Sequence, residues 1–139
     1  QRGLVITPDE VEMMWSDKYY ETNIKDAYDG KGNTEKLIAY GKKCKINFPA
    51  AEWCAAYCKN GVRPGEGFMP AKEQLKRIVA NRMIVNPALQ KIDGSELSGW
   101  IWSSSEYAYD RAWVVGARGG NVYDGSKYVG LYVRCVLAF

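Results

Sequence analysis

Helical spacing of apolar positions dominates the middle of the chain. The stretch FPAAEWCAAYCKNG, residues 48–61, predicts a helix, because proline stands near its start and glycine at its end. Cys54 and Cys58 are four residues apart in this stretch, so they share one helix face, which we expect to pack in the core. A second helix is predicted to begin at Pro70. Its inner face is made of residues at helical intervals, namely Leu75, Ile78, Val79 and Met83.

Shorter elements are expected nearer the N-terminus. GLVIT at residues 3–7 predicts a strand, and TPDE at residues 7–10 is a candidate capping box that predicts a short helical turn. Asn33 is a favourable N-cap for a helix over residues 34–42. Residues 1–28 are therefore expected to hold the strand and the helical turn.

Beyond residue 95 the pattern changes to Trp, Ser, Tyr, Val and Gly, which is typical of short strands and loops. Strands are predicted at residues 100–105, 111–116, 120–123 and 131–138. Helices precede a β-rich end instead of alternating with strands, so the predicted class is α+β. A chain of 139 residues is long enough for one domain with its own core, residues 1–139.

The composition excludes several classes of protein. Apolar residues make up 47% of the chain, which is too many for a disordered protein. The net charge of +3 comes from scattered Lys and Arg that form no basic stripe, so nucleic acid is not expected as a partner. No apolar run reaches the length of a membrane span, so we expect no membrane insertion.

The chain contains no histidine, which removes histidine-based catalytic triads and every metal site that needs histidine. We expect no enzyme, no bound metal and no cofactor. Glu106 and Asp110 are the acidic pair still to be considered, and we interpret them as a surface pair with no catalytic task. The four cysteines are an even number without CxxC spacing, which favours one disulfide, with buried free thiols as the alternative.

Unrelated side chains follow one another near the C-terminus without any hydrophobic period. They are called the mixed positions here: Ala108, Tyr109, Asp110, Arg111, Val114, Gly116, Arg118, Gly119, Tyr123, Asp124, Gly125, Ser126, Tyr128, Val129, Gly130 and Leu131. They are interspersed with apolar residues, namely Trp113, Val115, Val122, Tyr132 and Val133. Successive residues of a strand point to opposite faces, so the apolar set is predicted to be buried and the mixed set displayed.

Several motifs in a fixed order indicate a family. They are DGKGNT (29–34), PAAEWCAAYC (49–58), GFMPAKEQL (67–75), WSSSE (102–106) and YVRCVLAF (132–139). This order and spacing resembles that of bacterial and phage C-type-lectin-like domains, and the resemblance covers residues 29–139. Cys135 stands where many relatives have Pro.

Within that family the chain is similar to the variable proteins of diversity-generating retroelements in gut bacteria and their phages. In those proteins adenine-specific reverse transcription rewrites AAC and AAT codons near the 3′ end of the gene. Such codons cannot come to encode Lys, Glu, Gln, Met or Trp. Every mixed position carries a reachable residue, whereas Glu106, Trp113 and Lys127 are unreachable and belong to the framework. Ordinary loop sequence also favours Gly, Asp, Ser and Tyr and is the alternative interpretation.

The resemblance implies a C-type-lectin-like fold, with two main helices packed on a small twisted antiparallel sheet and the chain ends near each other. It implies a disulfide between Cys135 and a cysteine of the first main helix, Cys58 by family position or else Cys54. Such a bond would stabilise the fold by about 3–4 kcal/mol. The ligand-binding region is expected within residues 102–139.

The implied function is recognition, without catalysis, of an unknown protein or glycan ligand on a cell surface. The protein itself is expected at a bacterial surface, in secreted form or on a phage virion, and its oligomeric state is open. The displayed residue types match those of antibody paratopes. The expected hot spots are Tyr109, Arg111, Tyr123 and Tyr128, and Arg118 would add charge selectivity.

Three other functions compete with this one. A calcium-dependent lectin would need EPN- or QPD-type loops and a WND triad, and the chain has neither. The formylglycine-generating and iron-dependent enzymes of the same fold need a close cysteine pair or a His-carboxylate metal site, which also argues against an enzyme. A non-diversified surface adhesin with a fixed ligand shares both the fold and the binding role, and it is the main alternative.

Overall fold

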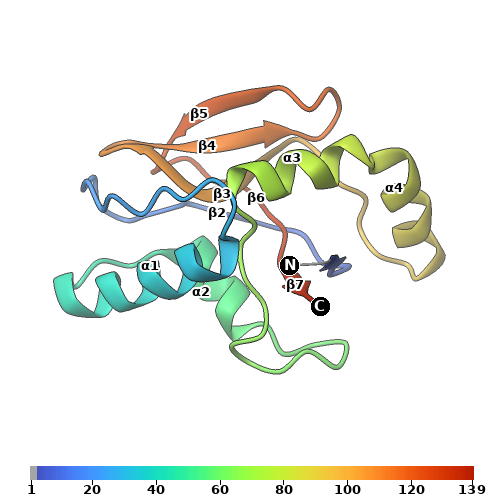
Figure 1. Cartoon of the computed structure of the whole chain (residues 1–139), viewed down its shortest axis with the longest axis horizontal. Helices are drawn as coiled ribbons and strands as arrows, with labels where there is room; N and C mark the ends of the chain where they lie inside the picture. Colours follow the sequence, from blue (N-terminus) through green and yellow to red (C-terminus); the bar gives the residue numbers. More distant parts are fainter. Residues whose placement is uncertain (1–2) are drawn as a thin grey trace.

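The computed structural model describes residues 3–139. This part of the chain holds seven strands and four helices. Figure 1 shows how they are arranged in space. The elements are β1 Leu4–Ile6, β2 Val11–Met13, α1 Gly30–Cys44, α2 Pro49–Ala56, α3 Lys72–Ala80, α4 Arg82–Lys91, β3 Trp100–Ala108, β4 Arg111–Gly116, β5 Val122–Ser126, β6 Leu131–Val133 and β7 Val136–Ala138.

Two sheets organise the strands. The main sheet has the order β2-β6-β3-β4-β5 and is antiparallel except for one parallel pairing between β3 and β6. A smaller sheet pairs β1 with β7, so the two ends of the described chain lie side by side, as the family resemblance implies. In Figure 1, α1 and α2 lie together on one side of the molecule, α3 runs beside the main sheet, and α4 lies beyond the end of α3. The α+β class predicted from the sequence is confirmed.

The core lies on both sides of β3. Trp102 is fully buried in a cluster with Trp15, Leu37 and Phe48. The preceding residue, Ile101, belongs to a second cluster, which includes Leu75, Val79, Val115 and Val136. Neighbouring residues of a strand point to opposite faces, so β3 is packed on both of its faces.

The first helix begins earlier than the sequence predicted. Asp29, and not Asn33, is its N-cap, because the Asp29 carboxylate accepts a hydrogen bond from the Gly32 backbone N–H at 2.9 Å. Asn33 is instead buried inside the helix, where its side-chain amide donates to the Asp26 carbonyl at 2.7 Å. The helix therefore occupies residues 30–44 instead of 34–42.

The predicted helical turn at residues 7–10 is absent, and this segment instead links β1 to β2. The helix expected over residues 48–61 ends at Ala56, because Tyr57 leaves helical geometry with a ψ of 125°. Cys58 therefore does not share a helix face with Cys54.

The second predicted helix is two helices. It begins at Lys72 instead of Pro70, and α4 follows α3 after Asn81. The predicted strand at 120–123 is β5 at residues 122–126, and the one at 131–138 is split at Arg134 and Cys135 into β6 and β7. The strand predicted at 111–116 matches β4.

The disulfide between Cys58 and Cys135 does not form, because all four cysteines are free thiols. Cys58 is exposed beyond the end of α2, whereas Cys135 is fully buried. Cys54 is the residue beside Cys135, whose thiol donates to the Cys54 carbonyl at 3.5 Å. Burial, followed by contact with Cys135, raises the pKa of the Cys54 thiol well above its usual value.

Candidate ligand-binding surface

The mixed positions follow the edges and turns of β3, β4, β5 and β6. One group lies at the end of the sheet where the β3–β4 and β5–β6 turns meet, since Arg111 pairs with Ser126 there. A second group runs along β4 and β5, and a third, Arg118 with Gly119, lies in the β4–β5 connection at the other end of β4. Among all the mixed positions, only Val114 and Gly116 are buried.

Three tyrosines form an aromatic group at the first of these ends, called the tyrosine cluster here. Tyr19 stacks on Tyr128 with ring centroids 3.8 Å apart, and Tyr109 meets Tyr19 edge-on at 6.2 Å. The Tyr19 hydroxyl also shares a hydrogen bond of 2.6 Å with the Ser126 hydroxyl. The exposed fractions of Tyr19, Tyr109 and Tyr128 are 40%, 55% and 47%, so each ring keeps area open to a partner.

Tyr123 lies apart from this cluster, on the face of β5. Its ring meets Trp100 edge-on at 5.0 Å, and both rings are partly exposed. A β-carbon at Gly116 would come within 2.9 Å of the Trp100 ring. Gly116 therefore packs against this ring and displays no side chain. The four predicted hot spots therefore do not converge on one spot.

The predicted alternation of buried and displayed residues is wrong along β4. Val114 is buried in the core cluster of Trp102, and Val115, its neighbour, is buried on the other side against α3 residues. Trp113, predicted to be buried, is only half-buried, and the Lys72 ammonium lies 4.5 Å from its ring centre. The strand has core on both faces, so its residues cannot divide into one buried and one displayed set.

Arg111 is engaged inside the protein. Its guanidinium forms an ion pair with the Asp124 carboxylate, and it also donates to the Asp124 carbonyl at 3.1 Å. Both side chains remain partly exposed, and such surface pairs contribute only about 0–1 kcal/mol. Each partner can therefore be redirected toward a ligand at small cost.

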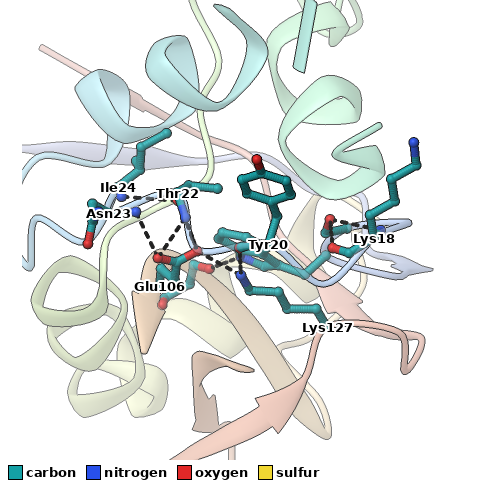
Figure 2. A network of polar contacts seen from close by, with 10 residues as sticks. Lys18, Tyr20, Thr22, Asn23, Ile24, Glu106 and Lys127 are labelled. Carbon is teal, nitrogen blue, oxygen red and sulfur yellow. Dashed lines mark hydrogen bonds and ion pairs between the residues drawn. The ribbon is translucent and has the colours of Figure 1, made fainter. Parts of the chain in front are cut away.

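Glu106 and Lys127 form a buried ion pair beneath the surface (Figure 2). The Lys127 ammonium lies 2.7 Å from the Glu106 carboxylate, and both side chains are almost fully removed from solvent. Glu106 also accepts hydrogen bonds from the backbone N–H groups of Thr22 and Asn23 at 2.9–3.1 Å. The interpretation of Glu106 and Asp110 as a surface pair is therefore wrong, because the partner of Glu106 is Lys127.

Burial, opposed by the hydrogen bond to Glu106, lowers the pKa of Lys127 below its usual range. The ammonium also lies 4.8 Å from the ring centre of Trp15 and donates to the Tyr20 carbonyl at 2.9 Å. Lys127 thus ties the segment around residues 15–24 to the end of β5.

Sequence reasoning missed Tyr19 and Trp100 as parts of this surface. Tyr19 precedes the region of family resemblance, and no pattern around it signals contact with residues more than a hundred positions away. The sequence predicted Trp100 only as the first residue of the strand at 100–105. Its neighbour in the structure, Tyr123, is a mixed position, but the pairing becomes visible only once the strand register is known.

A cavity of about 690 Å³ opens at the end of β4 opposite the tyrosine cluster. Arg118, Trp100, Arg82 and Asn86 are among its lining residues. Within residues 3–139, no group of three or more Cys, Asp and Glu side chains is placed to hold a metal ion. No helix in the same range combines the length and apolar character needed to span a membrane.

Comparison with solved structures relates the fold to a fimbrial protein from Bacteroides ovatus. The two superpose with a TM-score of 0.72 at 18% sequence identity, and the match covers 99% of this chain. It covers 36% of the fimbrial protein, so the chain spans about a third of that protein's length. No family model and no curated protein matches the sequence. At this level of identity the likeness shows a shared fold.

Proposed function

We propose that this chain is a non-catalytic ligand-binding domain of the C-type-lectin-like kind, exposed at a bacterial or phage surface and diversified by a retroelement. Its ligand is a protein or glycan on another surface, bound through the mixed positions without calcium. Each copy of the gene would carry one combination of residues at these positions on an unchanged framework.

One observation carries the proposal, namely how the reachable and unreachable residues divide between surface and interior. All mixed positions except Val114 and Gly116 are at least partly exposed. Two of the three unreachable residues, Glu106 and Lys127, form the buried ion pair beneath them. The third, Trp113, is half-buried and packs edge-on against Tyr107, with ring centres 4.6 Å apart. These three framework residues are thus ones that the codon change cannot produce.

The displayed side chains support binding more than any catalytic role. Exposed Tyr, Arg and Asp give large contact area and charge-assisted hydrogen bonds, which are features of antibody paratopes. The nearest acidic pair, Glu106 with Asp110, is not available for acid–base chemistry, since Glu106 is buried and held by Lys127 and backbone N–H groups.

A non-diversified surface adhesin is the second candidate, and the likeness to a fimbrial protein supports it. That likeness also supports a place on the bacterial surface for either candidate. The two differ only in whether the mixed positions change from copy to copy.

Sequencing of the gene and its neighbouring DNA in a population of the source bacteria or phages tests the proposal. We expect a near-copy of the codons for residues 102–139 that differs at adenines, a nearby reverse transcriptase gene, and variation confined to the mixed positions. Codons for Glu106, Trp113 and Lys127 should be constant. Because Val114 is buried, its codon should retain small apolar residues in the proteins that fold. Absence of the repeat, with no excess variation at the mixed positions, would leave the fixed-ligand adhesin as the function.

A further inference from the structure

The segment Trp15–Tyr20, called the tyrosine strap here, is bound to the mixed region through backbone atoms. The Trp15 and Ser16 N–H groups donate to the Lys127 carbonyl at 3.0 and 3.3 Å. The Tyr20 N–H donates to the carbonyl of Tyr109 at 3.1 Å. A backbone carbonyl is the same acceptor whatever side chain its residue carries. The attachment of the strap therefore does not depend on which residue occupies position 109.

Framework side chains hold the same strap from beneath. The Trp15 indole N–H donates to the Ser103 carbonyl at 2.8 Å, and the Lys127 ammonium donates to the Tyr20 carbonyl (Figure 2). At the outer bend of the strap, the Asp17 carboxylate accepts from the side-chain amide of Asn47 at 2.8 Å. All the side chains that make these bonds lie outside the mixed positions.

From these contacts we infer that the tyrosine strap is a constant part of the ligand-binding surface and that Tyr19 is its constant contact residue. This inference rests on the proposed function, since it assumes that the mixed positions bind the ligand. Tyr19 touches mixed positions 109, 126 and 128, so a partner seated on these residues also meets its ring. The binding surface thus combines one fixed aromatic side chain with changeable neighbours.

The partner that this end of the molecule fits is a protein surface with an apolar pocket. Stacked and edge-on tyrosines near two turns present a group of partly exposed rings, which can fill such a pocket as interface hot spots do. The cavity lined by Arg118 and Trp100 lies at the opposite end of β4, so the tyrosine cluster is separate from that concave site.

The constancy of the strap is testable in the natural chain without a ligand. Hydrogen exchange measured by NMR should show equal protection of the Trp15, Ser16 and Tyr20 amides in the wild type and in a Tyr109→Ser/Tyr128→Ser variant. The same amides should exchange at least tenfold faster in Lys127→Met, which removes the framework bond. Loss of protection in the double variant would overturn the inference, because the strap would then depend on the mixed positions.

The contact role of Tyr19 is tested by selection. The full chain, randomised at positions 109, 110, 126 and 128, is displayed on yeast and selected against hen lysozyme as the protein probe and against dextran as the glycan probe. In lysozyme binders we expect Tyr19→Ser to weaken binding at least tenfold. Tyr28→Ser, which changes a more exposed tyrosine just before α1 and outside the tyrosine cluster, should leave binding unchanged. Tyr19→Phe, which keeps the ring, should lose less than Tyr19→Ser.

The outcomes separate this inference from the proposed function. Lysozyme binders that respond to substitution at positions 109 and 128 but not at Tyr19 would overturn the inference and leave the proposed function intact. Binders that respond to none of these positions, or failure to obtain binders, would count against the proposed binding surface itself. Tyr19-dependent binders that arise with dextran alone would overturn the assignment of a protein partner.

Discussion

At the scale of single residues, the Glu106–Lys127 pair is a buried part of the framework beneath the mixed positions. An ion pair in the interior gains little net stability, because removing both charges from water opposes their attraction. Removing one partner is costly, because the other charge stays buried and unpaired. Glu106 has further acceptor bonds from Thr22 and Asn23, and Lys127 has a further bond to the Tyr20 carbonyl. The pair therefore fixes geometry more than it adds stability.

A double-mutant cycle on this pair tests that argument. We expect Glu106→Gln and Lys127→Met each to lower the free energy of unfolding by about 3–5 kcal/mol, since each leaves one buried charge. The double variant should lose clearly less than the sum of the two, because it leaves neither charge behind. Urea denaturation followed by circular dichroism measures all four proteins. Additive losses would contradict the idea that the two charges act as one unit.

At the scale of elements, the sequence predicted what local patterns determine and missed what distant packing determines. The strand at 111–116 was predicted from the local change to Trp, Val and Gly, and the structure has it there. The split of the last strand could not be predicted, because β6 pairs in the main sheet and β7 pairs with β1, and only tertiary structure separates them. Helix α4 was missed as a separate element, and Pro87 inside it is a residue that ordinarily argues against a helix.

Residues 66–68 pass between α2 and β7, and this crossing is a second feature that only the packing reveals. Gly67 lies against both the Cys54 carbonyl and the Cys135 thiol, and a β-carbon there would overlap the sulfur and come within 2.7 Å of the carbonyl oxygen. The segment also pairs with β7 through reciprocal backbone hydrogen bonds between Phe68 and Val136 at 2.9 and 3.0 Å. There is no room for the chain to move aside without breaking this pairing.

We therefore expect Gly67→Ala to lower the free energy of unfolding by about 1–3 kcal/mol, as overpacking in a core does. Gly130→Ala is the matched control and should change stability little, because its β-carbon would meet no atom within 4 Å. Adding Cys135→Ala to Gly67→Ala should recover only part of the loss, since the Cys54 carbonyl stays in place. Thermal and urea unfolding of the four proteins provide the values. Equal stability of the two single glycine variants would show that the chain at Gly67 has room for a β-carbon.

At the scale of the whole molecule, the residues of the proposed binding surface are mostly exposed, whereas the residues of the two core clusters are buried. Most of the C-terminal residues that were predicted to be displayed are at least partly exposed, and their irregular mixture of residue types is the pattern that indicated this. The sequence could not predict that Val114 and Gly116 are buried, since β4 has core on both faces, nor that residues 15–24 complete the surface. Those contacts join Tyr19 to Ser126 and Thr22 to Glu106, and such long-range pairings follow from the fold as a whole.

This separation predicts that widely spaced surface changes cost less than one framework change. A variant with Arg118→Ser, Tyr123→Ser and Val129→Ser alters exposed residues at both ends and in the middle of the surface. Exposed substitutions usually change stability by no more than about 0.5 kcal/mol each, and the edge-on contact of Tyr123 with Trp100 adds about 0.5–1.5 kcal/mol. The triple variant should thus lose no more than about 3 kcal/mol, which is at or below the loss of about 3–5 kcal/mol expected for Lys127→Met alone. Urea unfolding of both proteins at one pH and salt concentration makes the comparison. If the triple variant proved the less stable of the two, surface and scaffold would not be separable, and the frame could not tolerate diversification.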